Sequence, residues 1–175
     1  MKKILGVMLI AMLSITSVMA SDTAKIEAKY QSALKEFKKS KRAGSFFDKS
    51  YGYAIFPTIG KGGFGLGGAH GDGRVYVKGK YIADTSLSQF TIGFQVGGQV
   101  FSEILFFQDE HSFESFKRGN FELGAQASAV AIKAGVSADA NYENGIAIFT
   151  VAKGGLMYEA SVGGQTFDYE SLEEK

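Results

Sequence analysis

The 175-residue sequence contains no cysteine and only two histidines, and neither sign of charge dominates it. Without cysteine, disulfides, thiolate nucleophiles, zinc fingers and iron–sulfur clusters are excluded. Lysine plus arginine (19) almost equals aspartate plus glutamate (18), so the chain lacks the strongly basic composition of a general nucleic-acid-binding protein. The apolar fraction of 45% is that of a globular chain, and the length predicts one domain.

Motifs for catalysis and cofactor binding are incomplete. Residues 60–65 match the spacing GxGxxG, but they lead into an alternating strand pattern, whereas a dinucleotide fingerprint must open a helix. His70 and His111 do not form a set with the three protein ligands typical of a catalytic zinc site. We therefore predict no enzyme activity, no catalytic or metal-binding residue and no cofactor.

The first twenty residues have the pattern of a secretory signal peptide. Lys2 and Lys3 precede an uncharged, mostly apolar stretch, and Val18 and Ala20 suit signal peptidase. The stretch is shorter than the roughly 20 residues of a membrane span, so an uncleaved anchor is the weaker alternative. We expect residues 21–175 to form a single exported domain, periplasmic or extracellular and peripherally associated with a membrane.

The charge is unevenly distributed along the remaining chain. Residues 22–49 hold eight basic and four acidic side chains, whereas residues 50–175 hold nine basic and fourteen acidic ones. An amphipathic helix is predicted at about residues 22–43, with a second short helical turn over 45–51. Its apolar stripe contains Ile26, Tyr30, Ala33, Leu34 and Phe37. Lys35, Lys38, Lys39 and Arg42 fall opposite this stripe, and Lys41 falls near its edge.

From about residue 52 to 170 the pattern changes to alternation with period two, punctuated by glycine. We predict eight to ten short antiparallel strands, a turn at residues 71–73 and a short helix over 109–117. The predicted fold class is mainly β (α+β): a closed or nearly closed barrel or sandwich with one or two N-terminal helices. Glycines inside the strands indicate bulges and bends where the sheet curls.

The basic helix has two interpretations. A helix with lysine and arginine on its polar face can lie on an anionic membrane. Alternatively, its apolar stripe packs on the sheet and its basic face is merely solvated, which periodicity alone favours because most amphipathic helices face a core.

The order of several glycine-rich motifs resembles the SYLF domain family. Residues 54–57 and 61–68 (AIFP and KGGFGLGG) resemble its opening motif, and residues 90–99 resemble a glycine- and glutamine-containing strand that precedes an apolar one. Residues 121–128, 153–157 and 161–164 resemble its later motifs. Gln126 and residues 131–133 depart from the family pattern, which puts any site built from them in doubt.

The resemblance implies binding to an anionic phospholipid membrane, of the phosphoinositide type, through the basic helix. It implies no catalytic residues, and an actin-type partner is not implied for an exported chain of bacterial type. The lipid-binding residues carried over are Lys35, Lys38, Lys39, Lys41, Arg42 and Lys61. Ile26, Tyr30 and Phe37 would insert into the membrane, which requires the helix to roll or detach from the sheet. The alternatives are a small outer-membrane β-barrel and a soluble carrier of a small apolar ligand.

Overall fold

The computed structural model describes residues 22–119, 130–131, 142 and 144–174. The predicted signal peptide and the motif at residues 121–128 therefore lie outside the described residues. The elements are an N-terminal helix over residues 22–39, η1 (Gly44–Phe46), β1 (Gly52–Val77), β2 (Lys80–Phe107), α2 (Glu110–Lys117), β3 (Val130–Ala131), β4 (Ile146–Ser171) and η2 (Leu172–Glu174). The predicted mainly β class with an N-terminal helix is confirmed.

The strands form one sheet in the order β1-β2-β4-β3. The three long strands pair antiparallel, and the short β3 pairs parallel with β4. β1 and β2 are joined by Lys78 and Gly79, both with positive φ, which is the geometry of a tight type I′ hairpin. Among the described residues the sheet is open, with β1 and β3 at its edges, so the expected closure is absent.

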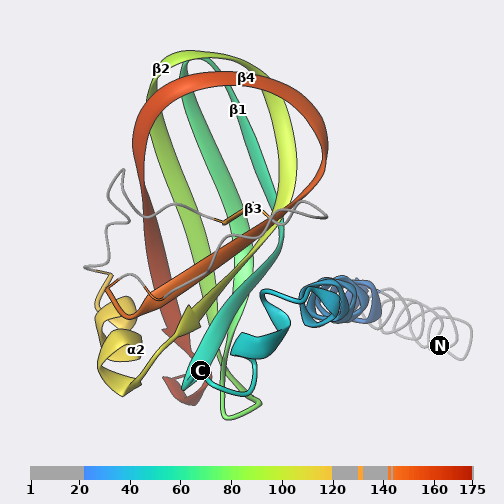
Figure 1. Ribbon diagram of the computed structural model, residues 1–175, viewed down its shortest axis with the longest axis vertical. Coiled ribbons are helices and arrows are strands. Elements are labelled where there is room, and N and C mark those ends of the chain that lie inside the picture. The colour runs from blue at the N-terminus through green and yellow to red at the C-terminus, as the bar shows by residue number, and fades with distance from the viewer. Residues whose placement is uncertain (1–21, 120–129, 132–141, 143, 175) are drawn as a thin grey trace, which may run out of the picture.

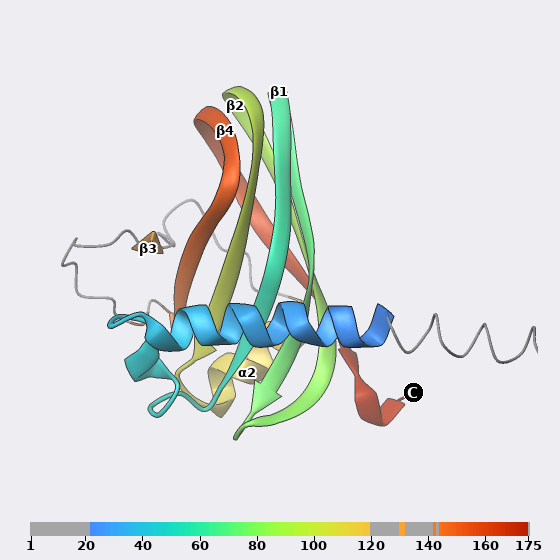
Figure 2. The ribbon, with the colours of Figure 1, turned by 90° about the vertical axis from the view of Figure 1, so that its right-hand side faces the viewer.

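The sheet bends over on itself, so that each long strand runs up one side of an arch and down the other (Figures 1 and 2). We call the bend the apex, made of residues 62–68 of β1, 90–98 of β2 and the paired part of β4. The first arm contains the beginning of β1, the end of β2 and the beginning of β4, as in the pairs Ile55–Ile104 and Leu105–Ile148. The second arm contains the remaining halves of the same strands.

The inner faces of the two arms pack against each other. The inner core includes Phe56 and Leu105 of the first arm, and Val75, Leu87 and Phe167 of the second, all buried. Helix α2 contributes Phe113 and Phe116 to this core, and Asp109 caps its first turn by accepting a hydrogen bond from the Ser112 amide at 2.8 Å. The helix predicted at residues 109–117 is thus confirmed.

The outer face near the base of the arch is covered by the N-terminal helix (Figure 2). This outer core combines buried side chains of the helix with side chains of all three long strands. Its members are Tyr30, Ala33, Leu34, Phe37, Ala43, Ile55, Tyr76, Ile104, Phe106, Ala147 and Phe149. The helix therefore uses its apolar stripe for packing.

The predicted short strands are continuous in the structure, because glycine bends them without ending them. The predicted turn at residues 71–73 is wrong: these residues lie inside β1, opposite the first arm. A Cβ on Gly71 would come within 2.7 Å of Ile59 Cγ1, and one on Gly73 within 2.6 Å of the Phe56 ring. The glycines permit close approach of the arms, and no change of chain direction is involved.

Gly73→Ala is expected to force the arms apart, because its new methyl group would meet the fully buried Phe56 ring and the Ile55 carbonyl oxygen. We expect the free energy of unfolding to fall by about 1–3 kcal/mol, the usual cost of overpacking. Chemical denaturation measures this change. Gly60→Ala is the matched control, since no atom lies within 4 Å of the position that its methyl group would take. Equal stability of the two variants would contradict the close packing of the arms.

Candidate lipid-contact surfaces

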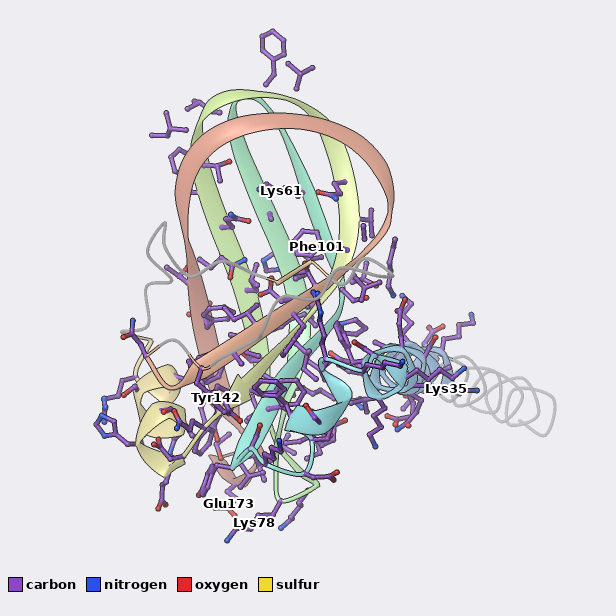
Figure 3. The ribbon with its side chains drawn as sticks, viewed as in Figure 1. Lys35, Lys61, Lys78, Phe101, Tyr142 and Glu173 are labelled. Atoms are coloured by element: carbon purple, nitrogen blue, oxygen red, sulfur yellow. The ribbon has the colours of Figure 1, made fainter. Side chains whose placement is uncertain are left out.

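The N-terminal helix presents a lysine face to solvent. Because Tyr30, Ala33, Leu34 and Phe37 are buried against the sheet, the other residues of this part of the helix point outward. Four of the predicted lipid-binding residues are exposed on this helix and the turn after it: Lys35, Lys38, Lys39 and Lys41. Lys38 also lies 5.3 Å from the centroid of the Phe47 ring. The structure thus brings these four lysines to one accessible region, which we call the lysine face (Lys35 is labelled in Figure 3).

The start of the helix is held to the sheet by Arg74 of β1. Its Nη1 donates to Glu27 Oε2 at 2.6 Å, and its guanidinium lies 4.2 Å from the Tyr30 ring centroid and 4.7 Å from that of Tyr81. Hydrogen bonds from Gln31 and Arg74 lower the pKa of Glu27. The arginine combines an ion pair with stacking on two rings, so it fixes the helix in one orientation.

In this packing only one of the three predicted membrane-insertion residues is accessible. Tyr30 is 6% exposed and Phe37 fully buried, so neither reaches a membrane while the helix is docked. Ile26 is 48% exposed and is the one accessible member of the three. Arg42 also differs from the lysines, because it is half-buried and its Nη2 is enclosed without a hydrogen-bond partner among the described residues. Tyr30 and Phe37 are inaccessible because the apolar stripe of the helix is buried in the outer core.

Lys61 lies apart from the lysine face, between the arms in the upper half of the arch (Figure 3). It is partly buried, and its charge acts on Glu103 of β2. Glu103 is 1% exposed; its Oε2 accepts a hydrogen bond from Gln165 at 3.4 Å, and its Oε1 has no partner among the described residues. Burial raises the pKa of Glu103 to about 7, against the opposing effects of Gln165 and Lys61.

Sequence reasoning missed an exposed apolar surface at the apex. Its large side chains lie on the outer face of the arch, where no other element of the described chain covers them. They are Phe64, Leu66, Phe90, Ile92, Val96 and Val100, and Phe64 is 83% exposed. The sequence feature that could have revealed this surface is an uncharged run of β2, from Thr85 to Ser102, in which apolar and polar residues alternate.

An acidic cavity of about 320 Å³ lies where Tyr30 of the helix approaches the second arm. Asp72, Asp84, Asp168 and Glu170 contribute four carboxylates to its lining. This cavity is electrostatically unsuited to an anionic headgroup, so the lysine face and the cavity divide the outer surface into regions of opposite charge.

Within the described residues, no group of three or more histidine, cysteine, aspartate or glutamate side chains is arranged to hold a metal ion. The same residues contain no helix with the length and apolar character needed to cross a membrane.

Two comparisons with known proteins bear on this arrangement. Residues 88–173 match the family model described as "Ysc84: Las17-binding protein actin regulator", which confirms the resemblance to the SYLF family. The chain is also 29% identical over 133 residues to "Beta cell expansion factor A" of Aeromonas veronii. That alignment covers 75% of this chain and 50% of the relative, so the chain spans about half the relative's length.

The buried Glu103 predicts a pH-dependent stability. Because its folded-state pKa is about 7, above the ordinary value of 4.5, the folded protein binds the proton more tightly than the unfolded chain. The contribution of this carboxyl is most favourable below pH 4.5 and is lost as the pH rises toward 7. Glu103→Gln, which stays neutral, should therefore be more stable than the wild type at about pH 8, by at most about 3 kcal/mol, and similar to it near pH 4.

Thermal or chemical unfolding of both proteins across this pH range measures the effect. Glu36→Gln, a change at an exposed glutamate of the helix, is the control and should follow the wild-type profile. A stability difference between Glu103→Gln and the wild type that does not grow between pH 4.5 and 7 would contradict a carboxyl held neutral by burial.

Proposed function

From the Ysc84 (SYLF) family match over residues 88–173, we propose that this chain binds anionic phospholipid at a membrane surface. The family supports a lipid-binding or actin-regulator-related role. The finer part of the proposal is that the lysine face makes the headgroup contact and that the protein acts after export. The exposure of Lys35, Lys38, Lys39 and Lys41 on a helix whose apolar side is already packed is the observation that carries it.

The charge arithmetic supports an electrostatic contact. Each basic side chain near an anionic membrane surface contributes about 1 kcal/mol, so four give about 4 kcal/mol before screening by salt. The helix stays docked in this mode, because the lysines are accessible without exposing Tyr30 or Phe37. Binding through the lysine face therefore needs no unfolding of the outer core, unlike insertion of the apolar stripe.

Two alternative functions, a carrier of a small apolar ligand and an actin regulator, have less support in the structure. A carrier of a small apolar ligand requires an apolar cavity, whereas the described cavity of about 320 Å³ has four carboxylates in its lining. The actin-regulator description belongs to the family, and no surface among the described residues favours an actin-type partner over a membrane. Phosphoinositide is one headgroup class that a cluster of lysines would attract.

Lys35→Glu/Lys39→Glu tests the lysine face. These two exposed residues are one helical turn apart, so the double variant replaces attraction with repulsion on one side of the helix. We expect binding to vesicles of phosphatidylcholine mixed with phosphatidylserine to weaken about 30-fold or more, as expected for losing two contributions of about 1 kcal/mol each. Co-sedimentation at low and physiological salt measures it, and the wild-type affinity should fall with salt.

Lys78→Glu/Lys80→Glu is the matched control, with the same change in net charge at the exposed hairpin at the base of the arch (Lys78 is labelled in Figure 3). It should bind like the wild type. An equal loss in both variants would mean that only net charge matters, and full binding by Lys35→Glu/Lys39→Glu would remove the lysine face from the proposal.

A further inference from the structure

The face of the sheet that carries apolar side chains changes between the base and the apex of the arch. Near the base, the inner face of β2 carries Leu87 and Leu105, which are fully buried in the inner core. Toward the apex, the residues that alternate in phase with them are polar, as in Gln89, Thr91 and Gln99. The polar inner side is thus enclosed by the arch, and the residues that point the other way are apolar.

The outer face of the apex is correspondingly apolar and exposed. Phe90 and Ile92 are each 59% exposed, and Leu66 of the neighbouring strand is also 59% exposed. At Gly63 the bend of β1 is too tight for a side chain, because a Cβ there would come within 2.5 Å of the Leu66 carbonyl oxygen. Apolar residues outside and polar residues inside is the pattern of a sheet that faces lipid, the reverse of a sheet in water.

We propose that the apex inserts into the hydrocarbon region of a lipid bilayer, with Phe64, Leu66, Phe90 and Ile92 as the inserting side chains. This inference rests on the proposed function in that both require a membrane. It names a different contact, however: an apolar anchor on the sheet, in place of the apolar stripe of the helix.

The distribution of charge favours a bilayer as the occupant. The outer face of β2 has no charged residue between Asp84 and Glu103, which permits burial in hydrocarbon without a desolvation penalty for an ion. The exposed Lys153 lies at the lower border of this region, at a bulge of β4 opposite Val100 and Phe101. A cation beside an apolar surface complements phospholipid phosphate when the apolar part is inserted.

The shape of the apex also favours lipid over a second copy of the chain. Val96 and Val100 lie on the part of β2 that descends into the first arm, whereas Phe90 and Ile92 lie on the part that belongs to the second. The apolar residues therefore occupy both outer sides of the bend. Hydrocarbon surrounds such a wedge completely, while a protein partner would need two separate surfaces to cover it.

The apex is separate from the lysine face. The helix packs on Ile55, nine positions before Phe64 in β1, which corresponds to about 30 Å along an extended strand. This length exceeds the Debye length of about 8 Å at physiological salt, so a change at one contact leaves the electrostatics of the other unaltered. Experiments can therefore remove the two contacts independently.

Because the chain has no native cysteine, a single introduced cysteine carries a fluorophore at a chosen position. Leu66→Cys labelled with an environment-sensitive dye should shift to shorter wavelength on phosphatidylserine-containing vesicles and be quenched by lipids brominated on their acyl chains. Lys78→Cys, at the opposite end of the arch, is the control and should show neither effect (Figure 3). An unquenched label at Leu66→Cys on vesicle-bound protein would overturn the inference.

Phe90→Ser/Ile92→Ser is the second arm of the test. Both side chains are exposed in the protein, so the fold should persist. Loss of two side chains that would be buried in hydrocarbon should weaken vesicle binding about 100-fold. Ile26→Ser, at the exposed apolar residue of the helix, should bind like the wild type. The residual salt-sensitive binding of the double variant should disappear on adding Lys35→Glu/Lys39→Glu.

The outcomes separate this inference from the proposed function. If the wild type binds no vesicle, the proposed function and the insertion both fail. If the wild type binds but Phe90→Ser/Ile92→Ser binds equally well, only the insertion fails. If the wild type forms a dimer in the absence of lipid that this double variant abolishes, a second copy covers the apex and the insertion is overturned.

Discussion

The close approach of the two arms of the sheet is the constraint on which the rest of the structure depends. Gly71 and Gly73 lie directly against Ile59 and Phe56, so the second half of β1 folds down onto its first half. A single curved sheet thereby supplies both sides of its own core, which α2 completes. The arrangement explains how a chain without cysteine and with few helices buries its large aromatic residues.

The N-terminal helix follows from the same arrangement. Folding the sheet over leaves apolar residues such as Ile104 and Phe106 on its outer face, and the apolar stripe of the helix covers them. Arg74 fixes the helix by pairing with Glu27 and stacking on Tyr30. In the proposed function, the helix therefore offers a membrane its lysines while its aromatic residues remain in the core.

Much of the fold was predictable because local patterns suffice for it. Period-three-and-four spacing identified the N-terminal helix and its buried residues, and Asp109 marked the start of α2. The turn predicted at residues 71–73 was wrong because glycine serves equally well in a turn and in a close contact between arms, and only the tertiary fold distinguishes them. The same limit applies to closure, which depends on pairing between strands distant in the sequence.

The candidate site was predictable only in part, for a related reason. The lysines of the helix are evident from the sequence. Alternation along β2 shows that the two faces of the strand differ, but it does not show which face is turned outward. Phe90 and Leu87 belong to the same strand, yet one is exposed and the other fully buried, since the two residues lie on opposite faces of the arch.

A membrane contact built from lysines alone would be weak. About 4 kcal/mol of electrostatic attraction corresponds to a dissociation constant near 1 mM, and salt reduces it further. With Tyr30 and Phe37 in the core, Ile26 is the one member of the predicted insertion set through which the docked helix could add an apolar contribution. In the insertion proposed above, the exposed apolar side chains of the apex supply it. Because apolar burial is insensitive to ionic strength in the millimolar range, the proposed lysine-driven approach and the proposed apex-driven retention would be physically distinct steps of a single binding process.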